Sequence, residues 1–133
     1  MDKLIINDKL SIIGVIIYAE DEKHIPYTCG ALISIHGIHY IVDSFGLERI
    51  IKNFDIKAVN NFSTVTLSKN GHTLTSKCTV GNKLIKSINK NCKTNEEVME
   101  QYAISNNFIF IRRRDINSII EGIKDWGKYK WNF

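Results

Sequence analysis

The chain has 133 residues, of which 44% are hydrophobic and 24% charged, and its 18 Lys and Arg side chains exceed its 14 Asp and Glu by four. This length and composition predict a single globular domain over residues 1–133 and exclude collagen, a coiled coil and intrinsic disorder. The longest apolar stretch, residues 10–19, has about half of the roughly 20 residues that a membrane-spanning helix needs, so no membrane segment is expected.

The positive charge is concentrated in one region of the chain. Residues 1–50 contain four cationic and seven anionic side chains, whereas residues 51–93 contain eight lysines and a single carboxylate, Asp55. Such a local excess of lysine favours polyanions or an acidic partner. The three cysteines form no closely spaced pair, which predicts free thiols in a reducing, cytoplasmic compartment and no structural zinc site.

The first third of the chain is predicted to form strands. Residues 10–19 are rich in β-branched side chains and lack helical periodicity, which indicates a strand buried on both faces at the centre of a sheet. Residues 31–35 and 38–42 flank a His-Gly pair that suits a two-residue turn. In the resulting hairpin Ile33 faces Tyr40.

A helix and a second hairpin follow. Asp43 or the next residue caps a helix with apolar side chains at helical spacing. These side chains are Leu47, Ile50, Ile51 and Phe54. Residues 64–68 and 73–76 flank an Asn-Gly pair, which is a strong hairpin signal, and the register places Leu67 opposite Leu74.

The remaining part of the chain is predicted to be mainly helical. Residues 81–92 place apolar side chains on one side of a helix and lysines on the other, within an arc of about 80°. Residues 94–97 form a capping box that begins another helix, which residues 106–107 end. A short strand over residues 108–111 and a last helix capped by Asp115 complete the chain.

This order of elements predicts an α+β fold, in which a mostly antiparallel sheet with two β-hairpins is covered by three to four helices. The sequence contains no phosphate-binding loop, dinucleotide motif or serine-hydrolase motif, so we expect no catalytic residues, metal or cofactor. Asp8, Asp21 and Lys23 have the residue types of a divalent-metal nuclease site, which keeps that activity open as an alternative.

Two basic regions form the candidate binding site. Lysines on one face of the helix predicted over residues 81–92, together with those of the second hairpin, would neutralise phosphates and release counterions. If the strand over residues 108–111 continues, Arg112 and Arg114 share a face and bind phosphate or carboxylate groups, while Arg113 points the opposite way. The candidate residues are Lys69, Lys77, Lys83, Lys86, Lys90, Lys93, Arg112 and Arg114.

The same residues have a simpler interpretation as solvated surface. Lysine is a common surface residue in a chain so rich in Ile, Lys and Asn. The arginines, in turn, are able to form surface ion pairs with Glu121, Asp115 or Asp125, and each such pair contributes little to stability. Basic composition therefore leaves open whether the charged surface binds a ligand.

We predict a non-enzymatic binding module whose favoured ligand is nucleic acid or another polyanion. Two alternatives stay open: a small metal-dependent nuclease, and a viral or mobile-element interaction factor that binds an acidic host protein. At the end of the chain Tyr129, Trp131 and Phe133 alternate with lysines or polar residues. This pattern suits core packing, base stacking or a homodimer contact.

Overall fold

The computed structural model has an α+β fold, with eight strands in two sheets and three helices in the part of the chain that it describes. That part consists of residues 3–18, 23, 25–61, 64–77, 92 and 94–125. The helix predicted over residues 81–92 lies outside these residues. None of the described helices is long and apolar enough to cross a membrane.

The larger sheet has five strands in the order β1-β2-β3-β4-β8. They are β1 (Leu4–Ile5), β2 (Leu10–Tyr18), β3 (Tyr27–Ile35), β4 (Ile38–Asp43) and β8 (Ile109–Ile111). All neighbours are antiparallel except β4 and β8, which are parallel. Ile33 pairs with Tyr40 as predicted, because His36 and Gly37 both have the positive φ of a tight hairpin turn.

The central strand of this sheet is β3, which corrects the prediction that the first long strand is central. β2 has only the two-residue β1 on its other side. It is nevertheless largely buried, since the second sheet packs against it through β7. Burial on both faces therefore comes from a neighbouring layer and does not require a central position in the sheet.

The smaller sheet has the order β5-β6-β7, which corrects the expectation of one sheet. Its strands are β5 (Lys57–Asn60), β6 (Thr64–Lys69) and β7 (His72–Lys77). Leu67 lies opposite Leu74, as predicted, and both are buried in the core with Val65. On the other face Thr66 is half-buried and Thr75 is exposed.

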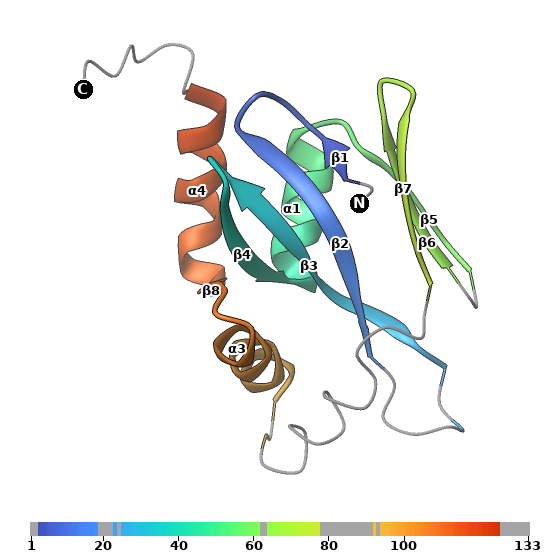
Figure 1. The fold of residues 1–133 in the computed structure, drawn as a ribbon, viewed down its shortest axis with the longest axis vertical. Coiled ribbons are helices and arrows are strands. Elements are labelled where there is room, and N and C mark those ends of the chain that lie inside the picture. The colour runs from blue at the N-terminus through green and yellow to red at the C-terminus, as the bar shows by residue number, and fades with distance from the viewer. Residues whose placement is uncertain are drawn as a thin grey trace.

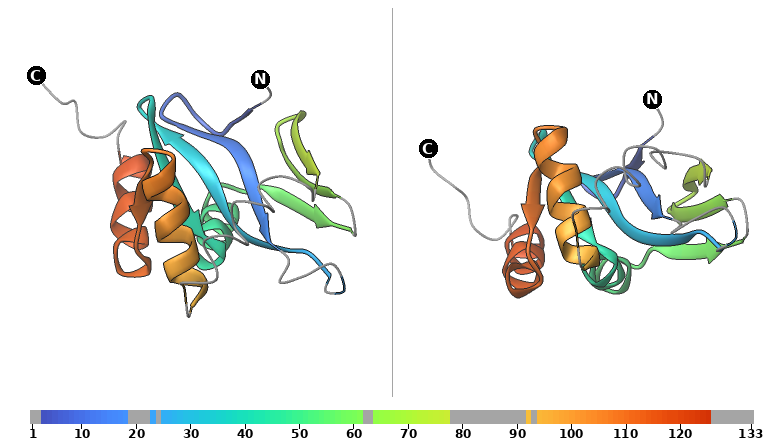
Figure 2. Two further views of the ribbon diagram at one scale, coloured as in Figure 1. Left: turned by 60° about the horizontal axis from the view of Figure 1, so that its bottom comes forward. Right: turned by 90° about the horizontal axis from the view of Figure 1, so that it is seen from below.

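The helices lie on opposite faces of the larger sheet (Figure 1). They are α1 (Ser44–Asn53), α3 (Asn95–Ser105) and α4 (Arg113–Asp125). α1, α4 and the smaller sheet share one apolar core, whereas α3 covers the other face of the larger sheet with Val98 and Met99. In Figure 2, α3 and α4 lie at one end of the molecule and the smaller sheet lies at the other.

Side-chain caps mark the first residues of α1 and α3. The buried Asp43 carboxylate accepts a hydrogen bond from the Gly46 amide (2.8 Å), which confirms the predicted N-cap of α1. The Thr94 hydroxyl likewise accepts from the Glu97 amide (3.2 Å) at the start of α3. The cap predicted at Asp115 is wrong, because α4 begins two residues earlier and Asp115 lies in its first turn.

Candidate functional site

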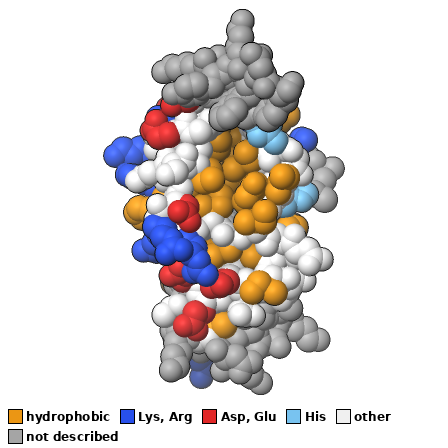
Figure 3. Space-filling model, turned by 90° about the vertical axis from the view of Figure 1, so that its left-hand side faces the viewer, with side chains coloured by type: hydrophobic (Ala, Val, Ile, Leu, Met, Phe, Trp, Pro, Cys, Tyr) orange, Lys and Arg blue, Asp and Glu red, His pale blue; other side chains and the backbone are white. Residues whose placement is uncertain are grey.

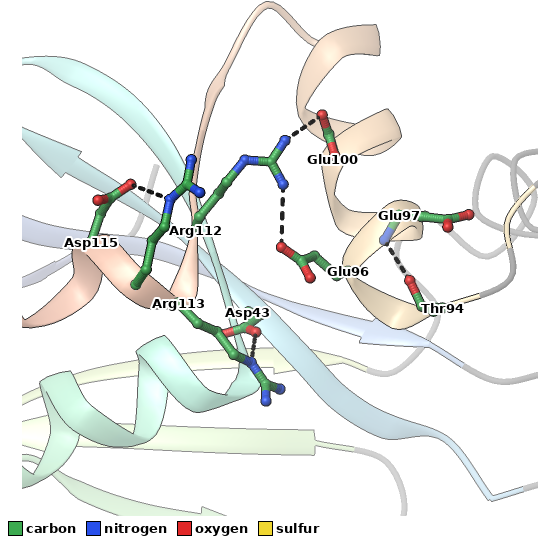
Figure 4. A network of polar contacts seen from close by, with 9 residues as sticks. Asp43, Thr94, Glu96, Glu97, Glu100, Arg112, Arg113 and Asp115 are labelled. Atoms are coloured by element: carbon green, nitrogen blue, oxygen red, sulfur yellow. Dashed lines mark hydrogen bonds and ion pairs between the residues drawn. The ribbon is translucent and has the colours of Figure 1, made fainter.

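Arg112 is held by carboxylates of α3 (Figure 4). Its two terminal nitrogens lie 3.3 Å from Glu96 Oε1 and 2.8 Å from Glu100 Oε1. The guanidinium also lies 5.8 Å from the centre of the Phe110 ring. Its charge is therefore already compensated, and a phosphate would have to compete with two carboxylates for it.

Arg113 joins β4, α1 and α4. Its Nε donates to Asp43 Oδ2 (2.6 Å), and Asp43 uses its other oxygen to cap α1. This hydrogen bond and the charge of Asp43 raise the pKa of Arg113. Figure 4 shows its side chain directed at Asp43, so Arg113 has a structural partner that the sequence did not indicate.

Arg112 and Arg114 do not share a strand face, because the condition for that arrangement, a strand that continues past residue 111, is not met. The strand ends at Ile111 and the helix begins at Arg113, so backbone alternation does not extend through the arginines. Arg114 is 80% exposed, and its Nε lies 3.9 Å from Asp115 Oδ2. The expected ion pair to Asp115 is thus present, and it is long and exposed.

The predicted lysines are mostly outside what the structure describes. Lys83, Lys86, Lys90 and Lys93 lie outside the described residues. Lys77 is the last residue of β7, and its side chain is not described either. The ammonium of Lys69 lies 5.7 Å from the centre of the Phe54 ring, next to the end of α1. The lysine face therefore remains a prediction.

Of the three residues considered for a nuclease site, the structure describes Asp8 and Lys23. Asp21 lies outside the described residues, and Asp8 forms an ion pair with Lys9 (3.1 Å). Among the described residues, no three His, Cys, Asp or Glu side chains are close enough together to hold a metal ion.

Cys29 is a buried thiol in β3. Its Sγ lies 3.4 Å from the Ile16 carbonyl oxygen, to which the thiol donates. Burial raises the pKa of Cys29 to about 12. A thiol that stays protonated near neutral pH is a poor nucleophile, so Cys29 has the properties of a core residue.

A polar groove of about 470 Å³ runs between α1 and α4. It brings together side chains that are distant in the sequence. The groove is lined by Arg49, Lys52, Asn53, Asn117, Ile120, Glu121 and Lys124. Three of these side chains are cationic and one is a carboxylate, so the groove carries a net positive charge at neutral pH.

Neutral groups orient two of these cations. A terminal nitrogen of Arg49 donates to Asn117 Oδ1 (3.0 Å), and Lys124 Nζ donates to Asn53 Oδ1 (2.8 Å). Arg49 also lies over the Phe45 ring, 5.6 Å from its centre. An amide oxygen or a ring face fixes the direction of a cation without removing its net charge.

The cations of this groove have no carboxylate partner in the described part of the chain. Neither Arg49, Lys52 nor Lys124 forms an ion pair there, although Glu121 lines the same groove. Sequence reasoning missed the groove because α1 and α4 are separated by about sixty residues and neither helix is conspicuously basic. The available signal was the helical spacing of Arg49, Lys52 and Asn53.

Three isoleucines are exposed on neighbouring elements: Ile38 of β4, Ile104 of α3 and Ile109 of β8. Figure 3 views the side of the molecule that carries α3, α4 and β8, and it shows apolar side chains gathered beside a group of cationic ones. β8 is the last strand of its sheet in the described part of the chain. The homodimer contact suggested by Tyr129, Trp131 and Phe133 stays a prediction, since these residues lie outside the described part of the chain.

Comparisons with protein-family models, with curated proteins and with solved structures found no match to this chain. The candidate site therefore depends on its own geometry. Within the groove between α1 and α4, Arg49 and Lys124 combine a direction fixed by neutral amides with a charge that no carboxylate compensates in the described part of the chain.

Proposed function

We propose that the chain is a non-enzymatic binding module that takes a polyanion, such as the phosphate backbone of a nucleic acid, in the groove between α1 and α4. The observation that carries this proposal is the state of its cations. Arg49 and Lys124 are oriented by amide oxygens, and neither they nor Lys52 form an ion pair in the described part of the chain.

The cations of the groove differ from Arg112 and Arg113 in what an approaching phosphate would displace, and this difference supports the choice of site. A phosphate that approaches Arg112 or Arg113 must replace a carboxylate that already neutralises the guanidinium. A phosphate that approaches Lys124 or Arg49 replaces at most a neutral amide and gains a charge-assisted hydrogen bond. Binding in the groove therefore breaks no ion pair of the described structure.

The groove also explains why a polymeric anion is favoured over one small anion. Lys52 and Lys124 are exposed, and only Arg49 is half-buried, so the cations are spread along an open surface. A single phosphate at such a surface gains little, because water screens exposed charges. A chain of phosphates contacts several cations at once and releases several counterions.

A two-lysine variant tests the proposal. Lys52→Gln with Lys124→Gln should reduce the slope of log affinity against log salt concentration by about 1.4 units on a single-stranded oligonucleotide and about 1.8 units on a duplex. Lys3→Gln with Lys57→Gln removes the same charge at exposed positions outside the groove and is the matched control. It should change the slope much less.

Equal slopes for the two variants would contradict the groove as the site. A third variant replaces Lys83, Lys86, Lys90 and Lys93 by Gln. A reduced slope in this variant alone would place the site at those lysines. No affinity for either oligonucleotide at low salt would favour an acidic protein as the partner. Metal-dependent cleavage of the oligonucleotide would instead favour the nuclease.

A further inference from the structure

A second groove, of about 430 Å³, lies on another side of α1, between this helix and β5. Ala58 and Asn60 of β5 form one wall, and Val65 and Leu67 of β6 lie between the walls. The α1 wall is one helical face, made of Ser44, Leu47, Glu48 and Ile51. Most of this lining is apolar, in contrast to the cationic groove.

This groove continues into a larger hollow of about 560 Å³. Tyr27, Thr28, Asn60 and Val65 line both, so the two hollows are adjacent. The second one extends past Ile25, which is 68% exposed. Together they form an elongated apolar surface, which suits an extended chain better than a compact ligand.

Within the described part of the chain, the backbone of β5 has hydrogen-bonding groups without a partner at this groove. β5 is an edge strand of the smaller sheet as far as the structure describes it. The Asn61 amide donates to the Thr64 carbonyl oxygen (3.0 Å), and Val59 pairs with Thr66, so residues 59 and 57 form the hydrogen-bonded pairs of the ladder. The amide and carbonyl of Ala58 and Asn60 therefore point away from β6, toward the free edge.

The charge of the groove indicates what such a chain should carry. Glu48 is the one charged side chain among the described residues that line either hollow. It is exposed and forms no ion pair within the described part of the chain. A basic side chain near an apolar one would complement this wall.

We propose that the groove between α1 and β5 binds an extended peptide segment of a partner protein, which adds to β5 as a further strand. The peptide places an apolar side chain in the groove between α1 and β5 and, two residues along the chain, a basic side chain beside Glu48. Main-chain hydrogen bonds to Ala58 and Asn60 provide affinity, and the side-chain pockets provide selectivity.

The probe is a capped synthetic peptide of seven residues, Thr-Leu-Thr-Lys-Thr-Leu-Thr, in which the leucines and the lysine share one face of an extended strand. Its titration into ¹⁵N-labelled full-length protein should shift the amide signals of Ala58 and Asn60. Ala58→Trp, which fills the groove, should weaken binding at least tenfold. Val59→Trp is the matched control, since Val59 is the next residue, points to the opposite face and is 63% exposed. Both positions are exposed, so both variants should fold.

Two changes separate strand addition from unspecific apolar binding. N-methylation of alternate peptide residues should abolish binding in one of the two registers and leave it in the other, because only one set of amides faces β5. Glu48→Lys should reverse the preference between this peptide and a version with glutamate in place of lysine.

The proposal is overturned if the peptide leaves the signals of residues 58 and 60 unchanged, or if the two tryptophan variants lose affinity equally. Undiminished binding of both N-methylated peptides would assign the groove to a small apolar ligand. Self-association that Ala58→Trp removes and Val59→Trp does not would assign it to a second copy of the chain. Either assignment would exclude the partner peptide.

Discussion

Two grooves flank α1, and they differ in what their walls do for the fold. The groove toward α4 is polar, and its cations lie at the surface. The groove toward β5 is apolar, and Leu47 in its wall is also part of the core. Taking 100° per residue, the two sets of α1 side chains point roughly 140° apart across the exposed side of the helix, and the buried Gly46, Leu47 and Ile50 lie in the remaining arc of about 220°. One ten-residue helix thus separates two surfaces of opposite character.

The residues that line the two grooves differ in how far they can be substituted without loss of stability. A cation such as Lys52 has no structural task in the described contacts, so its charge is available to a ligand. A wall residue such as Leu47 is part of the core, so a substitution that reshapes the groove at this position also disturbs the packing of the core. Variation should therefore be tolerated on the α4 side and penalised on the β5 side.

The largest expected effect follows directly from this difference. Leu47→Ala should lower the free energy of unfolding by about 3 kcal/mol, because Leu47 is 4% exposed and its removal leaves a cavity. Lys52→Ala should change it by less than about 0.5 kcal/mol, since Lys52 is exposed. Chemical denaturation of both variants measures the difference. Similar losses for the two would show that the two walls are energetically alike.

A smaller effect is expected at Asp43, which contacts the first turns of both α1 and α4. Asp43 caps α1 and binds Arg113 of α4, so Asp43→Ala should destabilise the protein by about 2 kcal/mol. Asp43→Asn is the matched variant, because asparagine still caps a helix and lacks the charge that pairs with Arg113. It should recover about half of the loss in thermal unfolding. Full recovery would mean that the ion pair contributes nothing.

Local signals predicted much of the fold around these grooves. The cap at Asp43, the hairpin register of Ile33 with Tyr40 and that of Leu67 with Leu74 all depend on residues close in sequence, and the structure confirms them. The start of α4 was misjudged because Asp115 suits both a cap and a first turn, and sequence alone does not distinguish the two.

The candidate site was far less predictable than the fold. The carboxylate partners of Arg112 come from α3, and the amide partner of Arg49 comes from α4. These contacts exist because β8 adds parallel to β4 and positions both helices, a pairing between segments about seventy residues apart. Counting charges along the chain could not show which cations are neutralised, and that is what separates Arg112 from Arg49.

The smallest expected effect tests whether its carboxylate partners are what make Arg112 unavailable to a polyanion. Glu96→Gln with Glu100→Gln replaces the two carboxylates that hold Arg112 by neutral amides, which makes its surroundings resemble those of Arg49 in the cationic groove. Stability should change by less than about 1 kcal/mol, because these ion pairs are exposed. The freed guanidinium should raise the slope of log polyanion affinity against log salt by about 0.7 to 0.9 if it lies within reach of the bound polymer.

The control for that variant is Glu48→Gln with Asp55→Asn, which adds the same charge at exposed positions outside the cationic groove and releases no arginine from a carboxylate. Both variants raise the net charge by two, so a general electrostatic effect would increase affinity equally. A larger slope only for the Glu96 and Glu100 variant would show that a neutral partner leaves an arginine available where a carboxylate does not. Equal slopes would mean that net charge alone governs binding, and the distinction between Arg49 of α1 and Arg112, which follows β8, would lose its basis.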